Sequence, residues 1–383
     1  MNNRERILAI LNYKKYDRMP LLHFGYWRET LLKWANEGHI SVDQAKSWGD
    51  GNPTDDEITN LLGFDSNWAR TFNPGVYLDP GFEHKVIKTL PDGSRHERNG
   101  HGVTILVKND TVSIPAEIEH LLVDRASWEK HYKHRFQYSE SRVKRGGVNV
   151  NGKTVKAGEG GLDYLKTGER DCFYGIYCGS MIGHLRDIVG VVGLSYLIAD
   201  DRELVDEMVE TIGDLAYRCI KEALETGAKF DFAHFWEDIC FKNGPLVSPR
   251  FFKTKICPQY ERITSLLKEY GINIVTVDCD GKIDALVGHW LSSGVNTMFP
   301  IEVGTWDASI APWRAQYGKE LRGVGGMNKV VFSRDRAAID AEIERLKPLM
   351  DLGGFIPCPD HRIAPDGKWD LVKYYCDKMR TLK

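Results

Sequence analysis

The sequence predicts an α/β protein built as a (β/α)8 TIM barrel with an N-terminal extension and a small antiparallel insertion. From residue 172 onward, short apolar segments alternate with longer segments of helical periodicity, which is typical of βαβ units around a parallel sheet. Six such units fit into the last part of the chain, and the earlier part leaves room for two more. A doubly wound open sheet would be favoured by a GxGxxG turn after the first strand, and the sequence has no such turn there.

The N-terminal part contains three predicted helices and one predicted strand. Residues 4–11, 30–36 and 55–62 have the apolar spacing of helices, and the third of these segments has acidic residues in its first turn. Residues 21–24 are apolar and predict a short buried strand.

Two segments before residue 172 differ from the barrel pattern. Residues 82–123 predict an antiparallel insertion, with strands at 82–90 and 100–107, a PDGS turn between them, and a short extended piece at 111–115. Residues 139–171 are rich in Gly, Lys and Ser and have weak periodicity, so we expect a lid-like loop there.

The regular part of the chain predicts alternating strands and helices. The predicted strands are residues 173–177, 230–235, 272–277, 297–300, 321–325 and 354–358. The predicted helices are residues 202–226, 248–270, 283–293, 308–317, 334–352 and 369–382. We therefore expect residues 1–383 to form a single barrel domain.

Composition excludes several classes of protein. A net charge of −3 gives no basic surface for a nucleic acid, and no stretch approaches the length of a membrane span. The apolar run at the N-terminus is too short and too interrupted by charge for a signal peptide. The eight cysteines are scattered without a CxxC pair, as in reduced intracellular proteins. These features predict a soluble cytoplasmic enzyme without a nucleic-acid or membrane partner.

Acidic residues and one histidine follow the predicted strands, where barrels of this kind carry their chemistry. These candidates are Glu237, Asp238, Asp278, Asp280, Glu302 and His361. Each also has a structural interpretation, because strand ends carry turns and caps for the next helix. Glu237 and Asp238 would then bond loop amides, and Glu302 would form a solvated pair with Asp307. Cys279 stands between two carboxylates, which raise the pKa of a thiol and argue against a nucleophile.

Three of these residues predict a metal site. Asp278 and Asp280 are one residue apart on an extended segment, so their side chains point the same way. His361, from another strand end, would complete a mixed oxygen and nitrogen ligand set. Alternatively, Asp278 caps the next helix and Asp280 is a turn residue before Gly281.

Five segments together resemble the uroporphyrinogen decarboxylase superfamily, which also contains corrinoid-dependent methyltransferases. They are RERILAILNYKKYDRMP, FWEDICFKNGPLVSPRFF, ALVGHWLSSGVNTMFPIEVG, YGKELRGVGGMNK and GGFIPCPDHRIAPD. The resemblance covers most of residues 1–30 and nearly all of 172–383, whereas residues 31–171 match poorly. It implies a (β/α)8 barrel and either decarboxylation or methyl transfer.

Two departures from the superfamily favour methyl transfer. The decarboxylases carry an Arg-rich segment that binds the carboxylates of their substrate, and here only Arg18-Met19-Pro20 matches its start before an aromatic, nearly uncharged stretch. The methyltransferases bind zinc through a His-x-Cys pair and a later Cys, and the matching positions here are Asp278, Asp280 and His361. His361 also matches the histidine of the decarboxylases, which keeps that alternative open.

The resemblance therefore implies an O-demethylating methyltransferase. It would move a methyl group from a small methylated substrate, such as an aryl methyl ether, to the cobalt of a corrinoid on a separate carrier protein. The metal, if one is bound, is expected to be zinc or another divalent ion, and a homodimer is compatible with the prediction. The expected catalytic residues are His361, Glu237 and Asp280, and the expected substrate contacts are Tyr26, Trp27, Trp236 and Glu302. The alternatives are decarboxylation of a tetrapyrrole and a non-catalytic barrel that binds a tetrapyrrole or corrinoid.

Overall fold

A seven-stranded parallel sheet forms the centre of the molecule in the computed structural model, which describes residues 1–108, 114–168 and 170–382. Its strands follow one another in chain order, and each is hydrogen-bonded in parallel to the next. From one edge to the other, they are β3 (Thr71–Phe72), β10 (Gly175–Gly179), β11 (Phe232–Trp236), β14 (Val275–Asp278), β15 (Thr297–Ile301), β16 (Arg322–Met327) and β17 (Phe355–Pro359). The six strands predicted after residue 172 are all present, with small shifts at their ends.

A second, two-stranded parallel sheet lies beside one edge of this sheet. It consists of β1 (Leu22–His23) and β2 (Ser66–Asn67), and β1 lies beside β17. Beyond these strands, the chain pairs at Tyr26 and Ile363, where the Ile363 amide donates to the Gly25 carbonyl at 3.1 Å. The first and last strands are therefore neighbours, as the predicted barrel requires. Among the described residues, the hydrogen-bonded ladder does not run without interruption around the whole set.

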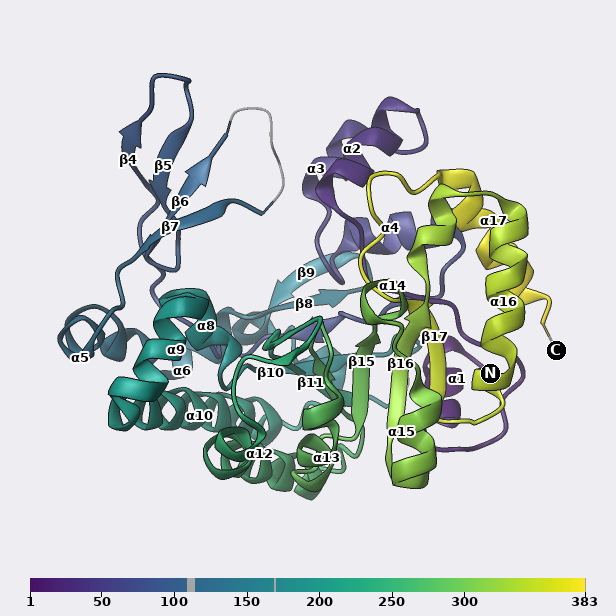
Figure 1. Ribbon diagram of the computed structural model, residues 1–383. Coiled ribbons are helices and arrows are strands. Elements are labelled where there is room, and N and C mark those ends of the chain that lie inside the picture. The colour runs from purple at the N-terminus through teal and green to yellow at the C-terminus, as the bar shows by residue number, and fades with distance from the viewer. Residues whose placement is uncertain (109–113, 169, 383) are drawn as a thin grey trace.

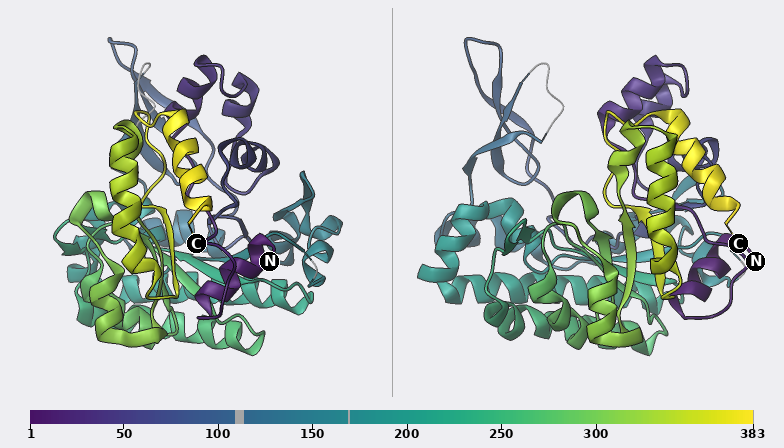
Figure 2. Two further views of the ribbon diagram at one scale, coloured as in Figure 1. Left: turned by 90° about the vertical axis from the view of Figure 1, so that its right-hand side faces the viewer. Right: turned by 45° about the vertical axis from the view of Figure 1, so that its right-hand side comes forward.

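Helices pack around these strands on the outside (Figure 1). They include α1 (Asn3–Leu11), α10 (Arg202–Glu225), α12 (Cys257–Glu269), α13 (Asp284–Ser292), α15 (Ile310–Tyr317), α16 (Arg336–Met350) and α17 (Trp369–Arg380). In α10, Leu204, Met208, Ile212 and Leu215 recur every three or four residues and are buried, which fixes the face turned toward the sheet. Both chain ends lie on the same side of the molecule (Figure 2).

Three helices lie between β1 and β2 in the chain. They are α2 (Arg28–Asn36), α3 (Val42–Ser47) and α4 (Pro53–Leu62). The ends of α4 follow from its sequence, because the Asn52 side chain accepts the Asp55 amide at 2.8 Å and Gly63 stops the helix in the left-handed region. These caps place the loop before α4 beside the cavity described below.

The insertion at residues 82–123 is an antiparallel sheet of four strands that projects from the body (Figure 1). Its strands are β4 (Lys85–Thr89), β5 (Arg95–Arg98), β6 (Val103–Val107) and β7 (Ala116–His120). The antiparallel arrangement was predicted, but the strand expected at 100–107 begins only at Val103, after a turn that contains Gly102. Strand β5, which precedes this turn, was missed. Of the extended piece predicted at 111–115, residues 111–113 lie outside the described residues.

The lid-like loop predicted at residues 139–171 contains regular structure instead. It comprises α6 (Glu140–Arg145), the hairpin of β8 (Gly147–Val150) and β9 (Lys153–Lys156), and α7 (Asp163–Lys166). Val143, Val148 and Leu165 are buried and anchor these short elements, although they are too widely spaced to give a periodic signal. Residue 169 lies outside the described part of this segment.

Other differences lie between the predicted elements. The helix predicted at 248–270 is divided into α11 (Pro249–Phe251), a π-helical turn and α12. The segment before α10 folds into two helices, α8 (Gly183–Val189) and α9 (Val191–Asp200), that were missed. Further elements that were not predicted are α3, β2, β3, β7, α5 (Arg125–Ser127), β12 (Cys240–Phe241), β13 (Gly244–Pro245) and α14 (Val303–Trp306). Among the helices of the described ranges, none has the length and apolar character that crossing a lipid bilayer requires.

Candidate active site

A cavity of about 500 Å³ opens at the carboxyl ends of β10, β11 and β14. Functional groups of parallel α/β proteins gather at this end of the strands. Its wall combines aromatic rings with three histidines and several charged side chains. The charged residues are Asp50, Asp238, Asp278, Asp280 and Arg362, so acidic groups outnumber the single guanidinium.

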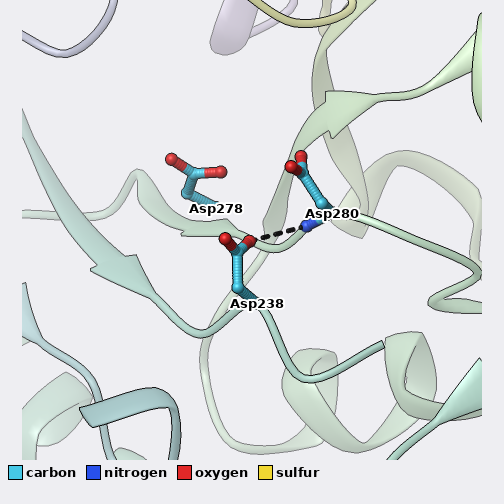
Figure 3. Close-up of side chains that lie close together, drawn as sticks. All are labelled: Asp238, Asp278 and Asp280. Carbon is cyan, nitrogen blue, oxygen red and sulfur yellow. Dashed lines mark hydrogen bonds between the residues drawn. The ribbon is translucent and has the colours of Figure 1, made fainter. Parts of the chain in front are cut away.

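Three of these aspartates form a cluster at the ends of two neighbouring strands. One carboxylate oxygen from each of Asp238, Asp278 and Asp280 lies within 4.8 Å of the others (Figure 3). Asp278 ends β14, and Asp238 follows β11 with a φ of 45°, a left-handed conformation that is uncommon for a residue with a side chain. Its carboxylate accepts the Asp280 amide at 3.0 Å, which ties the two strand ends together.

The cluster holds more negative charge than a buried site accommodates unaided. Burial is the larger cause and the charge of Asp280 the smaller one, and together they raise the pKa of Asp238 to about 7. Burial, with a smaller contribution from the charges of Asp238 and Asp280, raises the pKa of Asp278 well above its ordinary value. The cluster can therefore retain protons near neutral pH or bind a cation that compensates its charge.

His361 lies against this cluster. Its Nε2 is 3.2 Å from Oδ2 of Asp280, and its ring is close to the rings of Phe24 and Trp27, with centroid distances of 5.8 and 6.1 Å. The sequence predicted that residues 278, 280 and 361 would converge at one end of the sheet, and the structure places all three in the wall of one cavity.

Glu237 lies outside this cavity, contrary to its predicted catalytic position. Its carboxylate is fully buried and accepts the backbone amides of Met181, Ile182 and Gly183 at 2.8, 3.1 and 2.9 Å. The hydroxyls of Ser180 and Tyr260 also donate to it. Five donors occupy this carboxylate, so in this geometry Glu237 holds the turn before α8. The neighbouring Asp238 faces the cavity instead.

Two of the four predicted substrate contacts also lie away from the cavity wall. Tyr26 is 1% exposed, and its ring packs in the core between His23 and Trp34. Glu302 accepts the Gly281 amide at 2.5 Å and the Thr305 hydroxyl at 2.8 Å, so it supports the loop that carries Asp280. Burial raises the pKa of Glu302.

Of the other two predicted contacts, only Trp236 is part of the cavity wall. Trp236 lines the cavity, with the Arg186 guanidinium above its ring at 5.3 Å. Trp27 is partly buried beside His361.

Sequence reasoning missed several residues of the wall. His234 could have been found, because Phe232, His234 and Trp236 alternate along β11 and share one face. His184 follows the end of β10 but lies in an apolar segment that gave no strand-end signal. The Asp50–Arg362 ion pair, with nitrogen–oxygen distances of 3.2 and 2.6 Å, joins two distant segments without a local motif.

Two histidines of the wall are uncharged at neutral pH. Burial lowers the pKa of His184 to about 3 and that of His234 to about 4. His234 Nε2 lies 3.8 Å from Oδ2 of Asp278, which is beyond hydrogen-bonding distance. Both rings can therefore donate one hydrogen bond and accept another.

The ligand types of the cluster fit a divalent cation better than they fit a thiolate zinc site. Asp238, Asp278 and Asp280 supply oxygen atoms, and no cysteine lines the cavity of the described chain. The Asp280 Oδ1 atom is buried without a hydrogen-bond partner among the described residues, as expected of an oxygen placed for a ligand. Oxygen-rich sets suit magnesium, manganese or a carboxylate-bound zinc.

The fold and the site thus define an α/β protein with a parallel sheet, a surrounding layer of helices and an acidic, aromatic cavity at the carboxyl ends of the strands. No protein-family model and no curated protein sequence matches the chain. Among solved structures, a methyltransferase from Methanosarcina mazei aligns with a TM-score of 0.56 at 14% identity, over 99% of this chain and 98% of that chain. At this identity, the likeness shows a shared fold.

Two methionine synthases align less well. The B12-independent enzyme from Shewanella sp. W3-18-1, in complex with selenomethionine, has a TM-score of 0.46 and 11% identity over 95% of this chain and 98% of that chain. The putative vitamin-B12 independent enzyme from Listeria monocytogenes has a TM-score of 0.33 and 15% identity over 57% of this chain and 66% of that chain. These scores are too low to support an argument about fold or function.

Proposed function

We propose that this chain is a methyltransferase that takes a methyl group from a small methylated substrate, an aryl methyl ether, and delivers it to a corrinoid on a separate carrier protein. The observation that carries this proposal is the cavity, in which aromatic rings face a carboxylate–histidine cluster able to protonate a leaving oxygen. The whole-chain likeness to a methyltransferase fold supports it.

We infer that the strands make the ring of a (β/α)8 barrel. The pair β1 and β2, then β3, β10, β11 and β14 to β17 succeed one another in chain order, and β1 lies beside β17. The cavity then occupies the carboxyl end of the ring, the end that carries the active sites of such barrels.

Protonation of the leaving group is the step that the side chains of this chain can perform. An alkoxide or phenoxide leaves poorly, so a positioned acid accelerates the displacement, commonly by about 10²–10⁴-fold. His361 is placed for this role because Asp280 fixes its Nε2 at 3.2 Å and the ring faces the cavity. The pKa of Asp238, raised to about 7 by burial and by the charge of Asp280, lets that carboxyl resupply the proton near neutral pH.

The other components would be held or supplied as follows. As an alternative to this supply of protons, a divalent cation bound by Asp238, Asp278 and Asp280 would supply Lewis-acid polarisation of the leaving oxygen. The corrinoid would supply a cobalt nucleophile for the methyl carbon. A cavity of about 500 Å³ has the size of a site for one small molecule, so we place the corrinoid on a partner that docks over the opening. Trp236 and Phe24 would shield the reacting groups from water.

The charge of the cavity disfavours decarboxylation of a tetrapyrrole. A substrate with many carboxylates needs free guanidinium or ammonium groups to orient it. Here Arg362 is the one cationic side chain of the described wall with a fixed charge, and it already pairs with Asp50.

Methyl transfer to reduced cobalamin tests the proposal. Purified protein is incubated with cob(I)alamin and a set of aryl methyl ethers, and methylcobalamin is followed by its visible spectrum. We expect turnover that falls by at least about 100-fold in His361→Gln and in Asp280→Asn. Asp307→Asn, which alters a carboxylate outside the cavity wall, should retain full activity. Formation of coproporphyrinogen from uroporphyrinogen, or tight corrinoid binding without any turnover, would contradict the proposal.

A further inference from the structure

Part of the cavity wall carries polar groups without partners among the described residues. Nδ1 of His184, Nδ1 of His234 and the Tyr77 hydroxyl have no hydrogen-bond partner among the described residues. Both histidines are at least nine-tenths buried, with exposures of 4% and 5%. Buried polar groups are satisfied in more than about 90% of cases, so several unsatisfied groups around one cavity indicate a ligand that is polar on this side.

These groups share one chemical character. Together with Tyr177, they form what we call the hydroxyl subsite: Tyr77, Tyr177, His184 and His234. A phenol and a neutral imidazole each donate one hydrogen bond and accept another. A hydroxyl group of a ligand does the same, whereas a carboxylate only accepts and an ammonium only donates. The subsite therefore matches hydroxyl groups better than it matches ions.

The charged side chains in the rest of the cavity wall also favour an uncharged ligand. No lysine lines the described cavity, and the Arg362 guanidinium donates to both Asp50 oxygens while lying 5.2 Å from the centre of the Phe24 ring. When the acidic cluster holds no cation, a ligand carboxylate would find no positively charged group free to bind it. Electrostatics therefore disfavour an anionic ligand in the cation-free cavity.

The shape of the subsite favours a flat ligand. The rings of Tyr77 and His184 lie 4.1 Å apart at their centroids, and the His184 and Trp236 rings lie 6.1 Å apart. Tyr177 and His234 form a further ring pair at 6.3 Å. Flat side chains in such a row present faces and edges to an aromatic ring.

We propose that the substrate is the methyl ether of a phenol that keeps at least one free hydroxyl and carries no carboxylate, and that His184 and Tyr177 bind this hydroxyl. The inference rests on the proposed function, because it specifies the substrate of the same site. His234, the member of the subsite whose Nε2 lies 3.8 Å from Asp278, adjoins the reacting end of the ligand.

Equilibrium binding, measured by isothermal titration calorimetry, tests this assignment without turnover. The probes are 2-methoxyphenol, methoxybenzene, 2-methoxybenzoate and choline. We expect 2-methoxyphenol to bind about 10-fold more tightly than methoxybenzene, which lacks the hydroxyl. In protein freed of divalent cations with EDTA, the benzoate should bind at least about 100-fold more weakly than 2-methoxyphenol. Equal or tighter binding of the benzoate or of choline would overturn the assignment.

Variants identify the residues that recognise the hydroxyl. His184→Phe and Tyr177→Phe keep a ring but remove its polar atoms, so each should reduce the preference for 2-methoxyphenol over methoxybenzene to about 2-fold. Tyr138→Phe removes a hydroxyl that donates to Glu222 outside the cavity wall and should leave the preference unchanged. If His184→Phe fails to fold, as judged by circular dichroism, Tyr177→Phe carries the test. Full preference in the folded variants would overturn the proposal.

The binding and turnover experiments can refute the subsite and the methyltransferase proposal independently of each other. Selective binding of 2-methoxyphenol without methylcobalamin formation would leave the subsite intact and contradict the methyltransferase proposal. Turnover of another methyl donor, without selective binding of the phenol, would contradict the subsite and leave the methyltransferase proposal intact.

Discussion

Replacing Glu237 by alanine should destabilise the protein because five donors would lose their acceptor. The amides of Met181, Ile182 and Gly183 are buried and cannot turn to another acceptor. An unsatisfied buried donor costs about 1–3 kcal/mol, so the three amides alone cost about 3 kcal/mol or more. A side chain at Gly183 would come within 2.1 Å of the Glu237 carbonyl oxygen, so the turn has little freedom to rearrange.

Thermal unfolding followed by circular dichroism measures this loss. At about 2.1 cal/mol/K per residue, a chain of 383 residues has an unfolding entropy of about 0.8 kcal/mol/K near 60 °C. A loss of about 3 kcal/mol therefore lowers Tm by about 4 °C. Glu344→Ala provides a matched control, since this side chain is 67% exposed and pairs only with Lys347 at the surface. Its Tm should stay within about 1 °C of the wild type. A Tm for Glu237→Ala equally close to the wild type would refute the structural role of Glu237.

Three further predictions concern pH, metal and a helix cap. Burial lowers the pKa of His23 to about 3 from 6.5, so between these values the unfolded chain binds a proton that the folded chain does not. The free energy of unfolding should thus fall as pH drops below about 6.5, by up to about 1.4 kcal/mol per pH unit for this group. His23→Gln should flatten the pH dependence of the urea midpoint, and an unchanged pH dependence in this variant would contradict the prediction. Mn²⁺ at 100 times its Kd should raise the free energy of unfolding by about 2.7 kcal/mol. Asp238→Asn should abolish both this stabilisation and the electron paramagnetic resonance signal of bound Mn²⁺. Equal stabilisation of Asp238→Asn would exclude the cluster as the binding site. Asn52→Ala removes the cap of α4 and should cost about 1 kcal/mol in urea unfolding, and a loss below about 0.3 kcal/mol would show that the cap contributes little.

The parallel sheet was predictable because its strands are short, apolar and regularly separated by amphipathic helices. Each strand after residue 172 was expected within a few residues of its place, since burial on both faces leaves a continuous apolar run. The helices α8 and α9 were missed because residues 181–199 are apolar almost throughout and show no period. The structured segment at 139–171 was missed because a few widely spaced apolar anchors give no periodic signal.

The candidate site was predictable only where its residues follow strands directly. Asp278, Asp280 and His361 stand at strand ends, and the fold brings them into one wall. The choice between Glu237 and Asp238 could not be made from sequence, because it depends on the left-handed backbone at Asp238, which turns its side chain into the cavity. Asp50 comes from a loop whose position depends on long-range packing, and no local pattern marks it.

The pairing between the first and last strands has a consequence for synthesis of the chain. Gly25 bonds the backbone of Ile363, and Asp50 holds Arg362, so the N-terminal segment fixes the two residues that follow His361 only after the ribosome has released nearly the whole polypeptide. Until then, β1 has β2 beside it but lacks β17, and apolar surface stays open to chaperones. A nascent chain that ends before residue 361 therefore lacks both the histidine and the closing contacts, so truncated products would be inactive and prone to aggregate.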